Sequence, residues 1–144
     1  MLGNRRSDTH PEVRLRSALH RIGLRFRKDV PLVLPGGVRA RPDIVFPGAR
    51  VVVHCHGCFW HRCPLHATDP KAHSDYWAPK LAANVQRDER VDAALRAAGW
   101  AVIRVWEHED AQEAALRVAA AVRDRRAKSA GRVSDRRPEA RTPP

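Results

Sequence analysis

The chain has 144 residues, of which 43% are hydrophobic and 30% are charged. A chain of this length usually forms one domain, and its apolar content is enough for a buried core, which excludes a wholly disordered protein. Lys and Arg number 27 against 16 Asp and Glu, and the resulting net charge of +11 favours a polyanionic partner such as nucleic acid.

The sequence shows no membrane or export signal. No apolar run approaches the roughly 18 residues of a membrane span, and the first residues lead into charge without the apolar segment of a signal peptide. We therefore expect a cytoplasmic protein with no membrane partner. Its three cysteines, Cys55, Cys58 and Cys63, lie too close together for a disulfide framework and alternate with histidines, which favours metal binding.

The first half of the chain predicts one helix followed by three strands. The capping-box sequence Thr9-His10-Pro11-Glu12 begins a helix that ends at Gly23. Strands are predicted over residues 24–27, 40–46 and 50–55, with turns at Pro35-Gly36-Gly37 and Pro47-Gly48. Residues 56–74 show no usable periodicity, so we expect a loop that a bound metal would order.

The second half predicts a helix over residues 75–98 that ends at Gly99, a buried strand over 100–106 and an Ala-rich helix over 110–125. The predicted fold is α/β, with a small mixed sheet flanked by helices. We expect a folded domain over residues 1–122 and a flexible basic tail over 123–144, which has eight basic and three acidic residues. That tail is either a solvated terminus or a non-specific grip on DNA.

The clustered cysteines and histidines predict a structural zinc site. Cys58, Cys63 and His66 provide three ligands within nine residues, and His108, just past a predicted strand, is the fourth that we favour. Cys55, His61 and His73 are alternative fourth ligands. The competing interpretation is that the cysteines are small buried hydrophobic residues and the histidines are surface groups.

Several metal and nucleotide chemistries are disfavoured by missing motifs. No P-C-x-x-C segment completes a base-deaminase zinc motif, and neither H-E-x-x-H nor G-x-x-x-x-G-K-[ST] is present. Asp43, which follows Pro42 at the start of a predicted strand, lies where a carboxylate and a backbone carbonyl could hold Mg²⁺. Taken alone, this aspartate is equally consistent with a turn residue.

The segment His56-Gly57-Cys58-Phe59-Trp60-His61-Arg62-Cys63-Pro64 resembles the signature of the very short patch repair, or Vsr-type, mismatch endonucleases. Other segments match in the same order, so that the resemblance spans about residues 7 to 109. They are Asp8-Thr9-x-Pro11-Glu12, Pro42-Asp43-Ile44-Val45-Phe46, Asp75-Tyr76-Trp77-x-x-Lys80-Leu81-x-x-Asn84, Arg87-Asp88, Leu95-x-x-x-Gly99-Trp100 and Arg104-Val105-Trp106-Glu107-His108.

The resemblance implies a restriction-endonuclease-like fold of the PD-(D/E)xK-related kind, with a structural zinc and a catalytic Mg²⁺. It implies an enzyme that nicks one strand of double-stranded DNA beside the thymine of a T:G mismatch, and we expect a monomer. The family's catalytic positions match Asp43, His61, Glu12 and His56. The Mg²⁺ ligands match Asp43 and the backbone carbonyl of Cys55, and the aromatic residues that wedge into DNA match Phe59, Trp60 and Trp77.

Alternative interpretations remain for some of these residues. In a capping box, Glu12 is already committed to the start of its helix. Trp77 is as readily a core residue as a wedge, and Trp100 and Trp106 are expected in the core. Two further functions compete with mismatch nicking, namely a zinc-bearing DNA-binding module without activity and a nuclease of the same fold that acts on other foreign or modified DNA.

Overall fold

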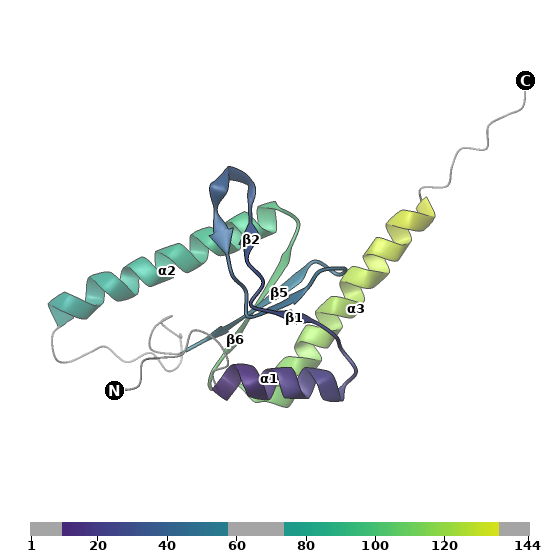
Figure 1. Ribbon diagram of the computed structural model, residues 1–144, viewed down its shortest axis with the longest axis horizontal. Helices are drawn as coiled ribbons and strands as arrows, with labels where there is room; N and C mark the ends of the chain where they lie inside the picture. The colour runs from purple at the N-terminus through teal and green to yellow at the C-terminus, as the bar shows by residue number, and fades with distance from the viewer. Residues whose placement is uncertain (1–9, 58–73, 136–144) are drawn as a thin grey trace, which may run out of the picture.

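The computed structural model describes residues 10–57 and 74–135, which form one mixed α/β unit (Figure 1). The helices are α1 (His10–Arg21), α2 (Ser74–Ala97) and α3 (Ala111–Asp135). The strands are β1 (Arg27–Lys28), β2 (Leu32–Val33), β3 (Arg39–Ala40), β4 (Ile44–Phe46), β5 (Val51–His56) and β6 (Ala101–Trp106), with a short 3-10 helix, η1 (Pro35–Gly37). The predicted sheet flanked by helices is confirmed, and the likeness to restriction endonucleases stays a prediction.

Four strands form the central sheet, in the order β1-β4-β5-β6. β4 pairs antiparallel with both β1 and β5, whereas β5 and β6 are parallel, in a register that places His56 opposite Trp106. The parallel pair is connected through α2, because parallel neighbours need a crossover connection. The carboxyl ends of β5 and β6 therefore lie along one edge of the sheet, together with the start of β4. This edge is formed by strand ends and differs from the outer side of the edge strand β6.

Each face of the sheet has its own helical cover, with α2 on one side of the strands and α1 and α3 on the other (Figure 1). Because successive strand residues point to opposite faces, Val51 and Val53 of β5 pack with α1 and α3, while Val52 packs with α2. All three valines are fully buried, as expected for a strand covered on both faces. No helix within the described ranges is long and apolar enough to cross a bilayer.

Pro42 divides the strand predicted over residues 40–46. Proline has no N–H to donate to a neighbouring strand, and β3 ends at Ala40 whereas β4 begins only at Ile44. This break leaves Asp43 outside the strand ladder, at the sheet edge described above. The prediction of one continuous strand was wrong.

The structure adds a hairpin that the sequence prediction lacks. β2 and β3 pair antiparallel on either side of η1, where Gly36 and Gly37 both take a positive φ that suits residues without a Cβ. The strand predicted over residues 24–27 was placed too early, because the pairing with β4 is confined to Arg27 and Lys28.

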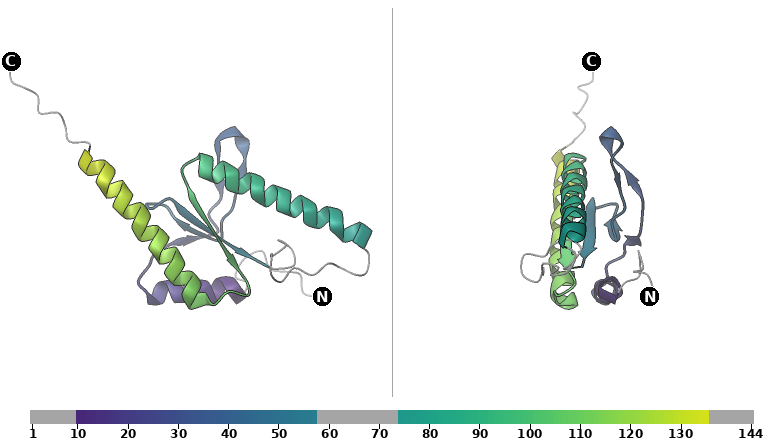
Figure 2. Two further views of the ribbon diagram at one scale, coloured as in Figure 1. Left: turned by 180° about the vertical axis from the view of Figure 1, so that it is seen from behind. Right: turned by 90° about the vertical axis from the view of Figure 1, so that its left-hand side faces the viewer.

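The last helix is longer than the sequence predicts. α3 continues to Asp135, whereas we expected its end at Arg125 and a flexible segment from Arg123. Its last buried side chain among those described is Val122, and beyond it the helix projects from the rest of the fold (Figure 2). Ala, Arg and Lys favour a helix without packing, so residues 123–135 are helical and the predicted helix end at Arg125 was wrong, whereas the tail predicted from Arg123 stays a prediction. Residues 136–144 lie outside the described part of the chain.

An ion pair covers the outer edge of β6, the last strand of the central sheet. Glu109 Oε2 accepts a hydrogen bond from the Trp106 N–H over 2.8 Å, and Arg117 Nη2 donates to the Arg104 carbonyl oxygen over 2.7 Å. Arg117 Nη1 also lies 2.8 Å from Glu109 Oε1. We call Glu109 and Arg117 the edge clamp, because they occupy backbone groups that a neighbouring strand would otherwise use.

Candidate active site

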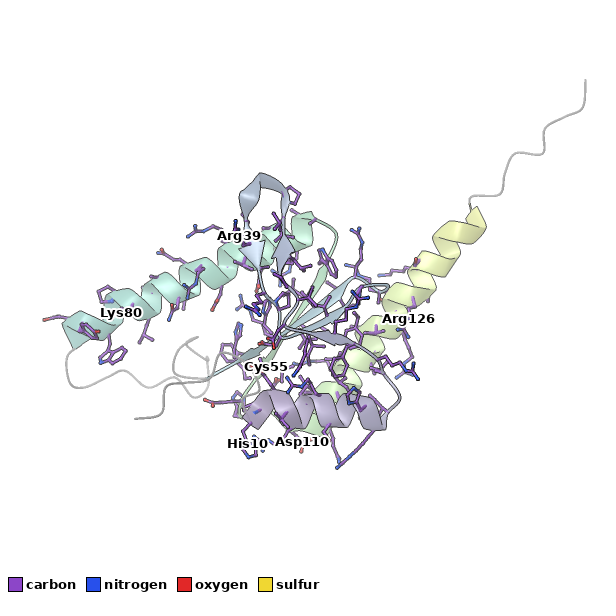
Figure 3. All side chains as sticks on the ribbon, in the orientation of Figure 1. His10, Arg39, Cys55, Lys80, Asp110 and Arg126 are labelled. Carbon is purple, nitrogen blue, oxygen red and sulfur yellow. The ribbon has the colours of Figure 1, made fainter. Side chains whose placement is uncertain are left out.

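The edge where β4 begins and β5 ends carries the predicted acid, Asp43. The antiparallel register, with Ile44 opposite Val53, brings Asp43 beside the end of β5. There the Cys55 N–H donates a hydrogen bond to Asp43 Oδ2 over 2.7 Å, and Figure 3 labels Cys55 where the strand ends approach α1. Because the N–H and C=O groups of one strand residue point to the same side, the Cys55 carbonyl oxygen also faces this edge.

Glu12 reaches the same edge from α1. Its side chain is 3% exposed and hydrogen-bonds with Asp43. Burial raises the pKa of Asp43 to about 7, and the charge and hydrogen bond of Glu12 add to this increase against the lowering effect of the Cys55 N–H. A buried and a half-buried carboxyl group in contact share protons or need a cation, so the pair is suited to a divalent metal ion.

Two further charged residues lie at the acid pair, and neither was identified from the sequence. Arg16 Nη1 lies 3.6 Å from Glu12 Oε2, and the charge of Asp29 contributes to the raised pKa of Asp43. Arg16 follows Glu12 by four residues on a predicted helix, which is a usable signal for side-chain contact. Asp29 has a positive φ of 51°. No spacing along the sequence predicts that it lies near Asp43.

The surroundings of Glu12 and Cys55 bear on their expected roles. The predicted capping box includes Thr9, which lies outside the described residues, but Glu12 itself contacts Arg16 and Asp43. Burial raises the pKa of the Cys55 thiol, so this side chain is a neutral apolar group that packs with the α1 and α3 core. Because Mg²⁺ prefers oxygen ligands, a role for Cys55 in holding this ion would use its backbone oxygen, as the family resemblance implies.

The end of β5 places its histidines on the opposite face, under α2. His56 is 6% exposed, and its ring centroid lies 5.3 Å from that of Trp106 at an interplanar angle of 77°. The His54 ring, two residues earlier in β5, lies 5.7 Å away. The candidate site thus combines carboxyl groups facing α1 with an imidazole facing α2.

A buried ion network lies behind these histidines, and it was not identified from the sequence. Asp92 of α2 is 2% exposed and accepts a hydrogen bond from Arg104 Nε over 2.8 Å. Its other oxygen, Oδ1, lies 3.7 Å from His54 Nε2. Arg104 alternates with apolar residues of β6, and Asp92 precedes Leu95 by one helical turn. The signal that could have revealed this network is the presence of one acid and two basic residues among the apolar residues of α2, β5 and β6.

His108, the predicted fourth zinc ligand, is exposed in the turn after β6. The preceding residue, Glu107, donates its N–H to the His56 carbonyl oxygen over 2.9 Å, and a Cβ on Gly57 would lie 4.0 Å from Glu107 Oε1. This turn therefore lies beside the residue that precedes Cys58. The other proposed ligands, Cys58, Cys63 and His66, are outside the described residues, within which no three His, Cys, Asp or Glu side chains cluster to hold a metal.

Of the predicted wedge residues, the structure describes Trp77. It is partly exposed in the first turns of α2, and its ring lies 5.2 Å from that of Tyr76, which is 56% exposed. Lys80, labelled in Figure 3, lies 3.9 Å above the Tyr76 ring. Trp77 therefore belongs to an exposed aromatic group. Phe59, Trp60 and the predicted catalytic His61 lie outside the described residues.

Comparison with known proteins identifies the class of enzyme. The chain is 52% identical over 118 residues to the type II nicking enzyme V.NaeI of Lentzea aerocolonigenes, covering 82% of this chain and 71% of that protein. It is 48% identical over 110 residues to the type II nicking enzyme V.XorIIP of Xanthomonas oryzae pv. oryzae, covering 73% and 74% of the two chains. The protein is accordingly a DNA endonuclease.

Two further similarities define its family. A family model described as DNA mismatch endonuclease Vsr matches residues 1–66. The chain is also 42% identical over 102 residues to the DNA mismatch endonuclease Vsr of Escherichia coli (strain K12), covering 69% of this chain and 62% of that protein. The chain belongs to the Vsr family of DNA mismatch endonucleases, which confirms the resemblance drawn from its sequence.

Proposed function

We propose that this endonuclease nicks one strand of double-stranded DNA beside the thymine of a T:G mismatch, with Mg²⁺ as cofactor, and so begins very short patch repair. The observation that carries the proposal is the contact between buried Glu12 and half-buried Asp43 at the sheet edge. Carboxylates facing a phosphate backbone hinder binding unless a cation lies between them. The names of the relatives, nicking enzymes and a mismatch endonuclease, support the cutting of a single strand.

We assign the Mg²⁺ ligands to the Asp43 carboxylate and the Cys55 backbone oxygen. The bound ion would polarise the scissile phosphate and lower the pKa of the attacking water. Glu12 hydrogen-bonds to Asp43 and keeps that carboxylate turned toward the Cys55 backbone. Arg16, 3.6 Å from Glu12, orients the supporting acid in turn.

The histidines are assigned by the family match together with the position of the strand ends. His61 would act on the attacking water or on the scissile phosphate. His56 lies at the end of β5, one residue after Cys55, and would contact the reacting phosphate from the side of the sheet that α2 covers. Imidazoles suit both tasks because they can accept a proton or donate a hydrogen bond near neutral pH.

The function is tested by a nicking assay on a labelled duplex containing T:G, with matched T:A and C:G duplexes as controls, in Mg²⁺ or in EDTA. We expect one labelled strand to be cut in the T:G duplex with Mg²⁺ alone. Equal cutting of all three duplexes would contradict the mismatch trigger and favour the second candidate, a nuclease for other foreign or modified DNA. That candidate is supported by relatives whose names specify nicking but no mismatch.

The third function considered from the sequence was a DNA-binding module without activity. It is not supported, because the relatives include nicking enzymes and an endonuclease.

We further propose one structural zinc per chain, held by Cys58, Cys63, His66 and His108. Two thiolates and two imidazoles suit tetrahedral zinc, and the turn that carries His108 lies beside Gly57, the residue before Cys58. Metal analysis of the purified protein should find one zinc per chain, and Cys63→Ala should lose it. Purified protein without stoichiometric zinc, or unchanged zinc in Cys63→Ala, would contradict this assignment.

Mismatch recognition is assigned to wedge insertion by Phe59, Trp60 and Trp77. The partly exposed Trp77 at the start of α2 is available for such stacking. Unstacking costs less at a mismatch than at a paired step, so aromatic stacking favours T:G before any base-edge hydrogen bond forms. Trp60→Ala should lower T:G binding toward the matched-duplex level, by about 1–3 kcal/mol. An unchanged preference for T:G over T:A would refute the wedge.

The projecting part of α3 is proposed as a non-specific contact to DNA phosphates. Arg123, Arg126 and Lys128 are exposed there, beyond the packed part of the helix. Ending the chain at Ala127 removes Lys128 and every later basic residue while it keeps Arg123 and Arg126, and it should weaken matched and mismatched duplexes alike and reduce the dependence of affinity on salt concentration. A loss confined to the T:G duplex would instead mean that this helix reads the mismatch.

A further inference from the structure

We propose that Trp106 positions the His56 imidazole in the active site, and that the edge clamp holds Trp106 in the required place. The inference rests on the proposed function, because it takes His56 as an active-site residue. Trp106 is a positioning residue in this proposal, since it acts through His56 and not on the substrate.

The contact between the two rings follows from the sheet itself. His56 and Trp106 are direct partners in the parallel pair of β5 and β6, so their side chains project from the same face. Their centroids are 5.3 Å apart at 77°, the edge-to-face arrangement that aromatic rings prefer. This geometry defines the plane of the imidazole in addition to its location.

A second ring limits the movement of His56 along strand β5. The His54 ring lies 5.7 Å from it, and His54 is itself placed by Asp92 Oδ1 at 3.7 Å. Asp92 is tied to Arg104 by a hydrogen bond of 2.8 Å. His56 therefore has two ring neighbours on this face, an imidazole held by an ion network and the indole of Trp106.

The edge clamp fixes the backbone of Trp106 from the outside of the sheet. The Trp106 N–H donates to Glu109 Oε2 over 2.8 Å, and the Trp106 carbonyl oxygen accepts from the Glu109 N–H over 3.0 Å. Arg117 bonds to both Glu109 and the Arg104 carbonyl oxygen. Both Arg104, two positions before Trp106, and the turn after Trp106 are thus held, although no strand among the described residues lies beside β6 on this side.

The position of His56 matters because it is coupled to the acid pair through one peptide unit. Cys55, the preceding residue, donates its N–H to Asp43, and the His56 carbonyl oxygen accepts from the Glu107 N–H. Any shift of the imidazole relative to this backbone changes its distance to a phosphate bound at Asp43. Displacements of about 1 Å can reduce the rate of an enzymatic step by roughly 100-fold.

The test compares Trp106→Leu with Trp106→Phe on the duplex that the parent enzyme nicks. We expect Trp106→Leu to lower the single-turnover nicking rate by about 10- to 100-fold while the Kd for DNA changes by less than about twofold. Trp106→Phe retains a ring edge against His56 and should keep the rate within about threefold. Equal rates in the parent and in Trp106→Leu would overturn the proposal, as would equal losses in the Leu and Phe variants.

Trp100→Leu is the matched control. Trp100 directly precedes β6 and so lies away from the carboxyl ends of β5 and β6. It is partly buried, packs in the core on the α2 side and lies under Arg50. The control should lower the melting temperature but leave the nicking rate unchanged in protein that circular dichroism shows to be folded. A rate loss in Trp100→Leu as large as in Trp106→Leu would mean that general destabilisation explains both, and would overturn the proposal.

A double variant separates this inference from the proposed function. If Trp106 acts through His56, adding Trp106→Leu to His56→Ala should cause no further loss of rate. A further loss equal to that of the single Trp106→Leu variant would overturn the positioning role and leave the proposed site intact. Parental activity in His56→Ala would show that the assignment of His56 itself is wrong, and the positioning role would fail with it.

Discussion

Two carboxylates lie on opposite sides of the sheet, Asp92 buried and Asp43 half-buried, and their surroundings differ in one respect. Asp92, on the α2 side, accepts a hydrogen bond from Arg104 and lies near His54, so its charge is matched by basic groups. Asp43, at the edge facing α1, is in contact with a second acid, Glu12. A buried carboxylate that is hydrogen-bonded to a guanidinium is expected to have a structural role. An acid in contact with a second acid lowers the stability of the fold, so it is expected where the pair has a function.

The raised pKa of Asp43 is a direct expression of this difference. Burial and Glu12 together raise it to about 7, so a metal-free site at neutral pH still holds a substantial share of its proton. A divalent cation would replace that proton. The comparison therefore assigns a structural role to Asp92 and a catalytic role to Asp43. The following variants test these two roles.

The largest expected effect is on catalysis. Asp43→Ala should reduce nicking by roughly 10⁴-fold, because it removes a carboxylate ligand of the proposed Mg²⁺, while DNA binding is largely retained. Single-turnover nicking and a gel-shift titration would measure the two quantities. Full activity in this variant would show that the active site lies elsewhere.

The next effect should be on stability, at the other carboxylate. Asp92→Leu alone should lower the free energy of unfolding by about 2–4 kcal/mol, because it leaves the partly exposed Arg104 without its buried partner. The double variant Asp92→Leu/Arg104→Met should recover to within about 1 kcal/mol of the parent and keep its nicking activity. Urea denaturation gives both values, and a stable double variant that fails to nick would assign Asp92 a catalytic role.

The pH dependence of stability should distinguish the two sites further. In EDTA the folded protein binds a proton at Asp43 up to about pH 7, whereas the unfolded chain releases it near the ordinary aspartate pKa of 3.8. This group therefore stabilises the fold most at low pH, and its contribution is lost as the pH rises from about 4 to 7.

Asp43→Asn removes that dependence. At pH 8 the variant should exceed the parent in unfolding free energy by about 2–4 kcal/mol, and the gap should close below about pH 4. Mg²⁺ should narrow the gap at pH 8 by stabilising the parent alone. A gap that does not vary with pH would contradict burial and Glu12 as the origin of the raised pKa.

The smallest expected effect concerns the arginine at the acid pair. Arg16→Gln should lower the free energy of unfolding by about 1 kcal/mol, since Arg16 is a partly exposed ion-pair partner of Glu12. Arg14→Gln, at an exposed position of the same helix, is the control and should change it by less than about 0.5 kcal/mol. If Arg16→Gln lowered the free energy of unfolding as much as Asp92→Leu does, the negative charge of Glu12 and Asp43 would be balanced by a basic group as that of Asp92 is. The contrast drawn between the two carboxylates would then be wrong.

Much of the fold was predictable because local signals were long and unambiguous. The valine run of β5 and the helices ended by Gly23 and Gly99 were expected close to their observed places, and both glycines take a positive φ. The hairpin of β2 and β3 was missed because each strand has two residues, too few for any alternation to show. The end of α3 was missed because the packing pattern stops at Val122 while helix propensity continues.

The site was less accessible to sequence reasoning. Nothing in local spacing brings Glu12 to Asp43, since they come from a helix and a strand start that meet only in the folded sheet, and the family resemblance provided the link. The network of Asp92, Arg104 and His54 was missed for the opposite reason. These residues lie in elements that were predicted from the spacing of their apolar residues. That spacing does not indicate which charged residues of α2, β5 and β6 contact one another.

The edge clamp also bears on the behaviour of this protein at high concentration. β6 is rich in β-branched and aromatic residues, with Arg104 its one charged residue, and such segments stack into fibrils when an edge is left open. Glu109 and Arg117 occupy the Trp106 N–H and the Arg104 carbonyl oxygen with an ion pair that an incoming strand would have to displace. The two side chains therefore oppose edge-to-edge aggregation at β6, which no other strand in the described part of the chain covers on that side.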